Sequence, residues 1–131
     1  MPTVVNPASL APPRGYSNGI VLGPGRILFV AGQIGWDRDG HVVSSDFVEQ
    51  FSQALRNVMD VVREAGGGAE HVGRLTIYVT DKARYLAELS GVGAAYREHM
   101  GKHYPAMALV EVAALVEDAA LVEIEATAVI P

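Results

Sequence analysis

The chain has 131 residues, no cysteine and a formal net charge of −5 at pH 7. Its length fits one domain, and its 50% hydrophobic and 19% charged residues are typical of a globular protein with a core. The lack of cysteine excludes disulfides, thiolate metal sites and a cysteine nucleophile. We therefore expect a single domain over residues 1–131.

The charge pattern and the apolar segments exclude several partners. The ten lysines and arginines are scattered, whereas a nucleic-acid surface needs a basic patch, so no nucleic-acid partner is expected. No apolar segment approaches the roughly 20 residues that span a bilayer, and residues 1–13 do not resemble a signal peptide. We expect a cytoplasmic protein with no membrane partner.

The N-terminal third of the chain predicts an extended arm followed by short strands. Residues 4–15 contain three prolines and no periodicity, which indicates the arm. Two β segments, 19–22 and 26–31, flank a Gly-Pro-Gly turn and predict a hairpin. A short third strand is expected at 41–43.

Two helices are predicted, with a strand between them. The first begins at an N-cap, Ser44 or Ser45, and carries apolar residues at three- and four-residue spacing up to a run of three glycines. The alternating segment 74–80 predicts a strand with one buried face. Asp81 is expected to cap the second helix, which ends before Pro105.

Two long β segments, 107–116 and 121–130, finish the chain and are expected to adjoin each other. The resulting order is β-β-(β)-α-β-α-β-β. It predicts an α+β fold in which two helices cover one face of a mixed, mostly antiparallel sheet.

The face away from the helices is expected to be covered by another copy of the chain. In segment 107–116 it carries Met107 and Leu109, and such apolar side chains do not favour contact with water. Two helices cover one side of a sheet only, so self-association is the simplest cover. The alternative is that the arm or the loops cover this face.

Three glutamates are the first candidates for chemistry. Glu123 and Glu125 lie on the mostly apolar face of the last strand, and Glu111 lies on the adjoining one. Carboxylates are seldom buried without a partner or a task, and a carboxyl group in a partly dry cleft can act as a general acid or base. The alternative is a structural ion pair at a subunit boundary, with one of three arginines as partner: Arg26, Arg74 or Arg97.

The histidines do not predict a metal site. His99 and His103 are four residues apart, a spacing that can place two ligands on one side of a helix. However, the helix is ending there and no third ligand is evident. We interpret both as solvent-facing polar residues and expect no metal.

Several separated segments form a recognisable set. They are Gly15-Tyr16-Ser17-Asn18, Phe29-Val30-Ala31-Gly32-Gln33-Ile34, Gln53-Ala54-Leu55-Arg56-Asn57-Val58, Tyr78-Val79-Thr80-Asp81, Pro105-Ala106, Val110-Glu111-Val112 and Val122-Glu123-Ile124-Glu125-Ala126. In order and spacing the chain resembles the RidA/YjgF family of enamine/imine deaminases over nearly its full length. The resemblance implies a chorismate-mutase-like fold and a homotrimer that binds small molecules in clefts between subunits, with no cofactor. The family's activity is hydrolysis of reactive enamines and imines to a keto acid and ammonia.

At four positions the chain departs from the family pattern. The family's arginine after Pro-Ala, which holds a substrate carboxylate by paired hydrogen bonds, is replaced by Met107. Leu109 stands in place of a cysteine, Ala31 in place of a serine, and Ser90 in place of an asparagine. The implied cleft is therefore more apolar than that of the family's deaminases.

Three site residues are retained: Tyr16, Gly32 and Glu123. Glu123 matches the glutamate to which the family assigns the positioning of the attacking water, and Tyr16 is expected to bind substrate. Arg14 is a candidate to replace the missing charge. Two functions follow: a RidA-type hydrolase with altered substrate specificity, or a non-catalytic trimeric module that binds a small ligand or acts like a chaperone.

Overall fold

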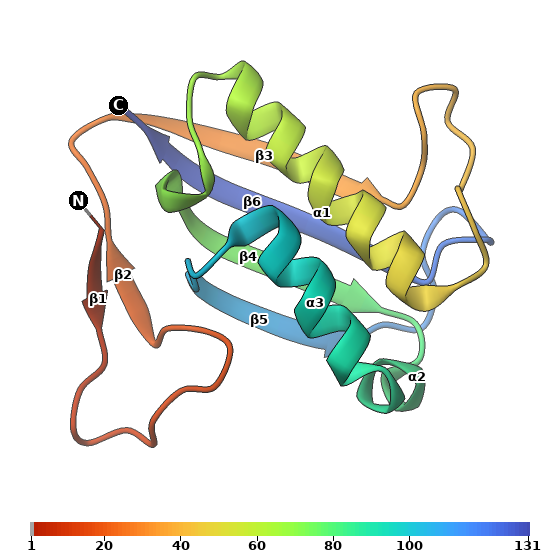
Figure 1. The fold of residues 1–131 in the computed structure, drawn as a ribbon, viewed down its shortest axis with the longest axis horizontal. Coiled ribbons are helices and arrows are strands. Elements are labelled where there is room, and N and C mark those ends of the chain that lie inside the picture. The colour runs from red at the N-terminus through yellow and green to blue at the C-terminus, as the bar shows by residue number, and fades with distance from the viewer. Residues whose placement is uncertain (1) are drawn as a thin grey trace.

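The computed structural model describes residues 2–131, which form a four-stranded main sheet, a small N-terminal sheet and a layer of helices (Figure 1). In chain order the elements are β1 (Thr3–Val5), β2 (Gly19–Val21), β3 (Arg26–Ile34), α1 (Phe47–Glu64), a 3-10 turn (Ala69–His71), β4 (Val72–Val79), α2 (Lys82–Ala87), α3 (Leu89–Met100), β5 (Ala106–Glu111) and β6 (Val122–Ile130). Among these residues no helix has the length and apolar character needed to cross a membrane.

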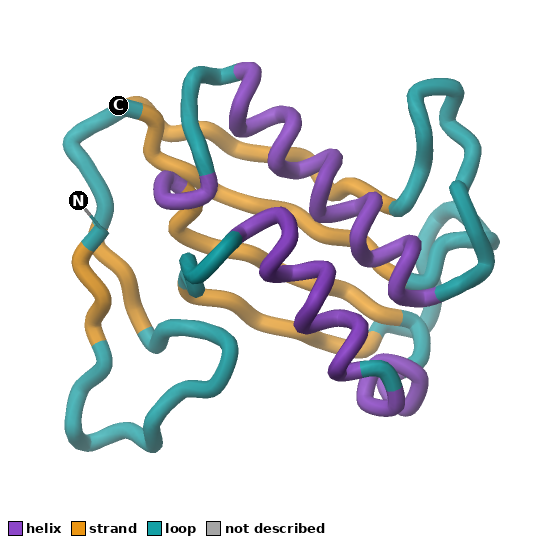
Figure 2. The backbone as a smooth tube through the Cα atoms, in the orientation of Figure 1, coloured by secondary structure: helices purple, strands orange, loops and turns teal. Residues whose placement is uncertain are grey.

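The main sheet has the strand order β3-β6-β4-β5. β6 is antiparallel to both β3 and β4, whereas β5 is parallel to β4. The parallel connection runs through α2 and α3, and α1 and α3 lie side by side on one face of the sheet (Figures 1 and 2). The predicted α+β fold, with two helices covering a mixed sheet, is confirmed.

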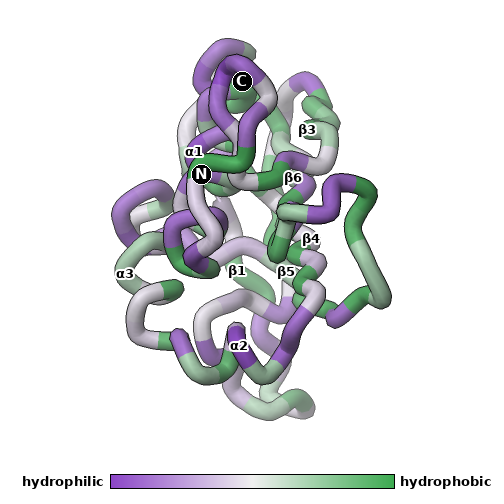
Figure 3. Tube along the Cα trace, turned by 90° about the vertical axis from the view of Figure 1, so that its right-hand side faces the viewer, coloured by the Kyte–Doolittle hydropathy of each residue, from purple (hydrophilic) through white to green (hydrophobic). Residues whose placement is uncertain are grey.

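The core lies between the helices and the main sheet. α1 presents Phe51, Leu55 and Val58 toward the sheet, and each is at most 2% exposed. β6 presents Val122 and Ile124, which are fully buried. The apolar stripe of the first helix and the alternation of the last strand were both predicted from the sequence and are confirmed. In the side view the helices lie on one side of the strands (Figure 3).

The helix ends differ from the prediction in two places. The N-cap of α1 is neither predicted serine but Asp46, whose carboxylate accepts a hydrogen bond from the backbone N–H of Glu49 at 3.0 Å. The second helix is capped by Asp81 as expected, but it is divided into α2 and α3. The division falls at Glu88, whose φ of −122° and ψ of 27° lie outside the helical range.

The predicted hairpin between segments 19–22 and 26–31 is wrong. β2 pairs with β1 in a separate two-stranded sheet that projects from the main body (Figure 1), while β3 pairs with β6. The nine residues of β6 offer β3 a longer row of cross-strand contacts than the three residues of β2 can. The expected third strand at 41–43 is only an isolated bridge between Trp36 and Val42.

The expected adjacency of the last two strands is also wrong, because β4 lies between β5 and β6. β5 ends at Glu111, and the chain leaves the sheet before it returns as β6. A parallel partner is reached through a helical crossover, and α2 and α3 supply that crossover between β4 and β5.

The side chains of β5 point the opposite way from the prediction. Met107 is in register with the buried Leu75 of β4 and packs, like Leu109, against the core on the helix side. Val110 faces away from the helices and is 44% exposed. We call the face of the main sheet away from α1 and α3 the open face. It carries the following residues: Ile27, Phe29, Tyr78, Val110, Glu123 and Glu125.

Candidate functional site

Glu123 lies on β6 at the open face, beside an irregular part of β3. The register between the two strands shifts between Val30 and Gln33, and Gly32 lies within that shift. A Cβ atom added to Gly32 would lie 2.5 Å from Oε2 of Glu123, closer than real contacts allow. The bare glycine therefore makes room for the carboxylate, and these two predicted site residues are neighbours. Ala31, next to Gly32, is exposed.

A tyrosine and a second glutamate lie beside Glu123 on the open face. Tyr78 of β4 is opposite Glu123 in the register, and its hydroxyl donates a hydrogen bond to Oε1 of Glu125 at 2.7 Å. This hydrogen bond, with smaller effects of lost hydration and of the two carboxylate charges, raises the pKa of Tyr78 above its usual 10.0. Glu125 is thus engaged, whereas the Glu123 carboxylate forms no hydrogen bond within residues 2–131.

Glu111 does not belong to this group. Its Oε1 accepts a hydrogen bond from the backbone N–H of Lys82 at 2.8 Å, at the start of α2. The expectation that it lies on a strand adjoining Glu123 is wrong, because β4 separates the two strands. Within the described part of the chain, no arginine lies at ion-pair distance from Glu123 or Glu125.

An apolar pocket of about 370 Å³ lies on the helix side of the molecule, where α3, the start of β5 and the N-terminal arm meet. We call it the Met107 pocket. Its lining residues are Arg14, Gly15, Phe51, Ile77, Tyr85, Leu89, Val92, Gly93, Tyr96, Arg97, Tyr104 and Met107. Two predicted site residues that are far apart in the sequence, Arg14 and Met107, therefore line one pocket.

Two hydrogen bonds hold the N-terminal arm beside β5. The backbone N–H of Ser17 donates to the carbonyl of Pro105 at 3.1 Å, and its hydroxyl donates to the carbonyl of Tyr104 at 2.5 Å. These bonds bring the Gly15-Tyr16-Ser17 segment next to the Pro105-Ala106 segment. Tyr16 itself is exposed and does not line the Met107 pocket.

Two further predicted substrate contacts, Ser90 and Leu109, belong neither to the residues around Glu123 on the open face nor to the Met107 pocket. Ser90 is exposed on the first turn of α3, next to Leu89, which lines the Met107 pocket. Leu109 is half-buried against the core and does not line the pocket.

The two groups of candidate residues do not meet within one chain. Glu123 and Gly32 lie on the open face, close to the edge strand β3. Met107 lies on the opposite edge strand, β5, and faces the helices. A site that uses both Glu123 and Met107 therefore needs two copies of the chain.

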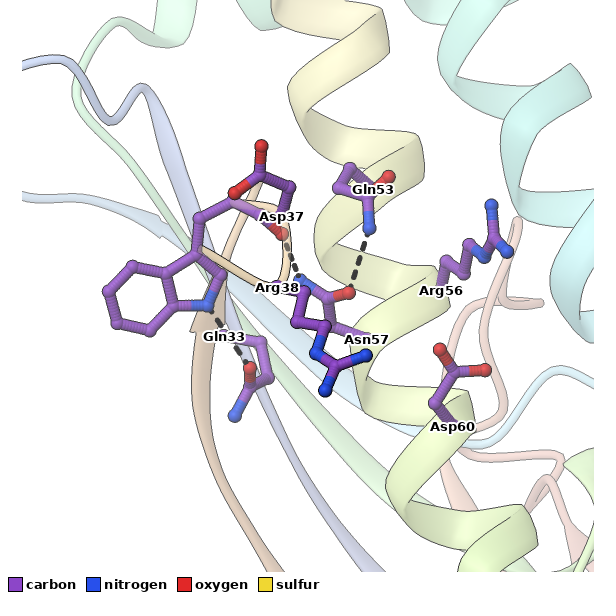
Figure 4. A pocket seen from close by; sticks show the side chains of 8 residues that line it. Gln33, Asp37, Arg38, Gln53, Arg56, Asn57 and Asp60 are labelled. Atoms are coloured by element: carbon purple, nitrogen blue, oxygen red, sulfur yellow. Dashed lines mark hydrogen bonds between the residues drawn. The ribbon is translucent and has the colours of Figure 1, made fainter. Parts of the chain in front are cut away.

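A polar pocket of about 520 Å³ lies where β3 meets α1, and the sequence alone does not predict it (Figure 4). Nδ2 of Asn57 donates to the carbonyls of Ile34 at 3.2 Å and Trp36 at 3.0 Å. Oδ1 of Asn57 accepts from Nε2 of Gln53 at 2.8 Å. These amides satisfy one another and the backbone, so they brace the loop after β3. The four-residue spacing of Gln53 and Asn57 on one helix face is the signal that indicates such a pair.

The two histidines near the end of α3 are not solvent-facing, contrary to the prediction. Nε2 of His99 lies 2.9 Å from Oγ of Ser52, and Nε2 of His103 lies 2.7 Å from the carbonyl oxygen of Val72. Burial lowers the pKa of His99 below its usual 6.5. No group of three potential metal ligands occurs among residues 2–131.

Comparisons with known proteins identify the family. A family model described as Endoribonuclease L-PSP matches residues 6–130. A crystal structure of a Rid-family protein of unknown function from Yersinia pestis superimposes with a TM-score of 0.88 at 33% identity, and the match covers 98% of each chain. The chain belongs to the RidA/YjgF family.

Curated relatives agree with this assignment to the RidA/YjgF family. A RutC family protein of Pyrococcus abyssi is 35% identical over 99 residues, which cover 75% of this chain and 73% of that protein. The human 2-iminobutanoate/2-iminopropanoate deaminase is 30% identical over 113 residues, which cover 86% of this chain and 76% of the human protein. The relatives thus support a role of the enamine/imine deaminase type at the level of the family.

Of the twelve residues that line the Met107 pocket, the RidA/YjgF resemblance predicts two as site residues, Arg14 and Met107. The sequence predicts Arg97 only as a possible ion-pair partner for a glutamate, whereas in the structure it lines the pocket with Arg14. Its position one turn after Gly93 is the available signal, because residues four apart share a helix face.

Proposed function

We propose that this RidA/YjgF member is a small-metabolite hydrolase that acts on an imine, an enamine or a related substrate, with an altered substrate preference. In this proposal Glu123 activates water. The protein assembles as a homotrimer, and each cleft takes the Met107 pocket from one copy and Glu123 from a neighbour. The human deaminase and the other relatives support the reaction type.

Uncovered apolar side chains on the open face support the assembly. Phe29 is 77% exposed and Ile27 is 64% exposed on β3, and Val110 is exposed on β5. Burial of apolar surface stabilises an assembly by roughly 25 cal/mol per Å², and α1 and α3 lie on the other side of the sheet (Figure 1). Copies that pack these faces together remove this surface from water.

The observation that carries the proposed chemistry is the fit of Glu123 against Gly32. The backbone of Gly32 approaches the Glu123 carboxylate closely and limits the positions that this carboxylate can take on one side. Within residues 2–131 that carboxylate has no hydrogen-bond donor, while its neighbour Glu125 is occupied by Tyr78. A positioned carboxylate with free acceptor sites can take a proton from water.

The reaction needs one general base and no redox step. Water gives a proton to Glu123 as its oxygen bonds to the carbon of a protonated imine, and the C=N electron pair moves to nitrogen. Glu123 then passes that proton to the nitrogen, and the C–N bond breaks as ammonia leaves. The remaining hydroxyl loses its proton through the carboxylate to solvent and becomes the carbonyl of the product. One water is consumed for each carbonyl and ammonia formed.

Met107 is the reason to propose an altered preference. An arginine at this position offers a planar pair of donors to a substrate carboxylate, whereas methionine has no charge and no donor. A flexible thioether instead suits apolar groups of irregular shape. A small acidic imine therefore loses its anchor at position 107.

The test is a coupled assay on released imines. Serine dehydratase releases 2-aminoacrylate, and an L-amino-acid oxidase releases imines of apolar amino acids; keto-acid formation is compared with spontaneous hydrolysis. We expect faster hydrolysis of at least one imine, and a loss of about 100-fold or more in Glu123→Gln. Glu125→Gln is the matched control, since it makes the same change two residues away, and it is expected to retain most activity. Equal activity of the wild type and Glu123→Gln contradicts the proposal.

Met107→Arg tests the altered preference separately. If the rest of the site is intact, this substitution raises hydrolysis of 2-aminoacrylate relative to the wild type. An unchanged ratio between 2-aminoacrylate and the imines of apolar amino acids contradicts the assigned role of Met107.

The mostly apolar lining of the Met107 pocket favours a second candidate, a trimeric module that binds a small ligand without catalysis. This candidate predicts binding of apolar ligands in the pocket but no acceleration for any imine tested. The same assay, combined with a binding measurement, therefore distinguishes the two functions.

A further inference from the structure

The Met107 pocket has an aromatic wall. Tyr96 of α3 and Tyr104 are stacked, with ring centroids 5.2 Å apart and planes inclined by 11°. The hydroxyl of Tyr96 donates to the carbonyl of His103 at 2.6 Å, so this residue offers the pocket its ring. With Met107 these rings form a surface that suits a carbon skeleton, and the volume of about 370 Å³ lies in the range of small-ligand sites.

Two guanidinium groups line the same pocket from different elements. Arg97 comes from α3, and a Cβ atom at Gly93 would lie 3.2 Å from its Nη1, so the glycine leaves room for the guanidinium. Arg14 comes from the N-terminal arm, which Ser17 ties to Tyr104. Both cations are thus placed beside the apolar wall by the packing of the chain.

Neither cation is neutralised within the described residues, where no carboxylate lies at ion-pair distance from Arg14 or Arg97. By contrast, Arg63 on α1 is paired with Asp60 at 3.3 Å. Both arginines are exposed to solvent, and a guanidinium makes its strongest hydrogen bonds to carboxylate or phosphate. Free guanidiniums next to an aromatic wall favour a ligand with one anionic end and an apolar body.

We propose that the Met107 pocket binds a small carboxylate with an apolar or aromatic body, and that Arg97 is its anionic anchor. Arg14 supplies a second contact to the carboxylate from the arm. The proposal rests on the proposed function in one respect, namely that this pocket is the substrate-binding half of the cleft. The substrate's carboxylate then contacts Arg97, and its apolar side chain contacts Met107 and the stacked tyrosines.

Isothermal titration calorimetry with two matched probes tests the anchor without any catalysis. 3-Phenylpropanoate and 3-phenylpropanamide share one body and differ in charge. We expect the wild type to bind the carboxylate about tenfold or more tightly than the amide. Arg97→Gln abolishes this preference, Arg97→Lys keeps part of it, and Arg14→Gln reduces it less. Arg63→Gln removes the same charge outside the pocket and is expected to leave the preference unchanged.

Equal affinity of the wild type for the two probes overturns the proposal, as does a preference that persists in Arg97→Gln. Circular dichroism and the unfolding midpoint of each variant show that it is folded. Arg97→Lys retains the positive charge, so its intermediate affinity distinguishes loss of the anchor from a general disturbance of α3.

A kinetic measurement separates this inference from the proposed function. For the imine of phenylalanine, Arg97→Gln is expected to raise KM about tenfold with little change in kcat, whereas Glu123→Gln lowers kcat and leaves binding of 3-phenylpropanoate intact. Carboxylate binding that depends on Arg97, without hydrolysis of any imine, refutes the proposed function but supports Arg97 as the group that binds the carboxylate. Hydrolysis that is indifferent to Arg97→Gln refutes the anchor alone.

Discussion

The two faces of the main sheet carry the same alternation of side chains and differ in what covers them. On the helix side, Leu75 and Ile124 are fully buried under α1 and α3. On the open face, Phe29 is exposed and Glu123 is half-buried. Strand periodicity determines which side chains share a face, whereas the cover must come from another layer. This chain completes the helix side by itself, and the open face is where we propose that a second copy contributes.

The largest expected effect is on the helix side. Leu55→Ala removes a fully buried side chain of α1 and leaves a cavity against the sheet, so the free energy of unfolding is expected to fall by about 3 kcal/mol. Val61→Ala, on the exposed side of the same helix, is expected to change it by less than about 0.5 kcal/mol. Urea unfolding followed by circular dichroism measures the free energy of unfolding of both variants. Similar losses for the two contradict the conclusion that α1 covers the sheet with the side that carries Leu55.

On the open face the expected effect is on assembly. Phe29→Asp places a charge where we propose that copies pack, so the dissociation constant of the assembly is expected to rise by at least about tenfold, or about 1.4 kcal/mol. Light scattering coupled to size-exclusion chromatography measures the molar mass against concentration. Leu86→Asp changes an exposed residue of α2 and is the control. A wild type that is monomeric at all concentrations contradicts the proposal that another copy of the chain covers the open face.

The layers of this molecule were predictable because they follow from short-range patterns. The stripe on α1 and the alternation on β6 each depend on side chains within a few residues of one another. Even the error at the start of α1 is small, since Asp46 follows directly after Ser45. Strand neighbours are different. The Gly-Pro-Gly turn indicates where the chain turns but not which strand it joins next, so the hairpin prediction failed.

The candidate site was only partly predictable, for the same reason. The family resemblance names Gly32 and Glu123, but their contact depends on the register shift in β3, which no local pattern indicates. β4 separates β5 from β6, and the register of β5 with β4 directs Met107 to the helix side, so Met107 lies away from Glu123. The sequence places Arg97 one turn after Gly93 but does not indicate that α3 and the N-terminal arm line one pocket.

Gly32→Ala is expected to affect function more than stability. The added Cβ would lie 2.5 Å from Oε2 of Glu123, and the end of this flexible side chain can move away. The free energy of unfolding therefore changes by less than about 1 kcal/mol, while the rate of imine hydrolysis falls by about tenfold or more because the carboxylate is displaced. Gly19→Ala, whose Cβ would have ordinary contacts, is the control. Unchanged activity in Gly32→Ala argues against Glu123 as the base.

The smallest expected effect is the titration of Tyr78 on the open face. The difference in ultraviolet absorbance between the wild type and Tyr78→Phe isolates this phenol, and its midpoint is expected above 10.0. Glu125→Gln lowers the midpoint more than Glu123→Gln, because Glu125 accepts the hydrogen bond as well as contributing charge. Because the folded-state pKa is raised, the stabilising contribution is complete below the unfolded pKa and is lost as pH rises through the folded value. A midpoint that does not move in Glu125→Gln shows that the Glu125 carboxylate does not accept a hydrogen bond from the Tyr78 hydroxyl. It then contradicts the arrangement of polar side chains that we describe on the open face.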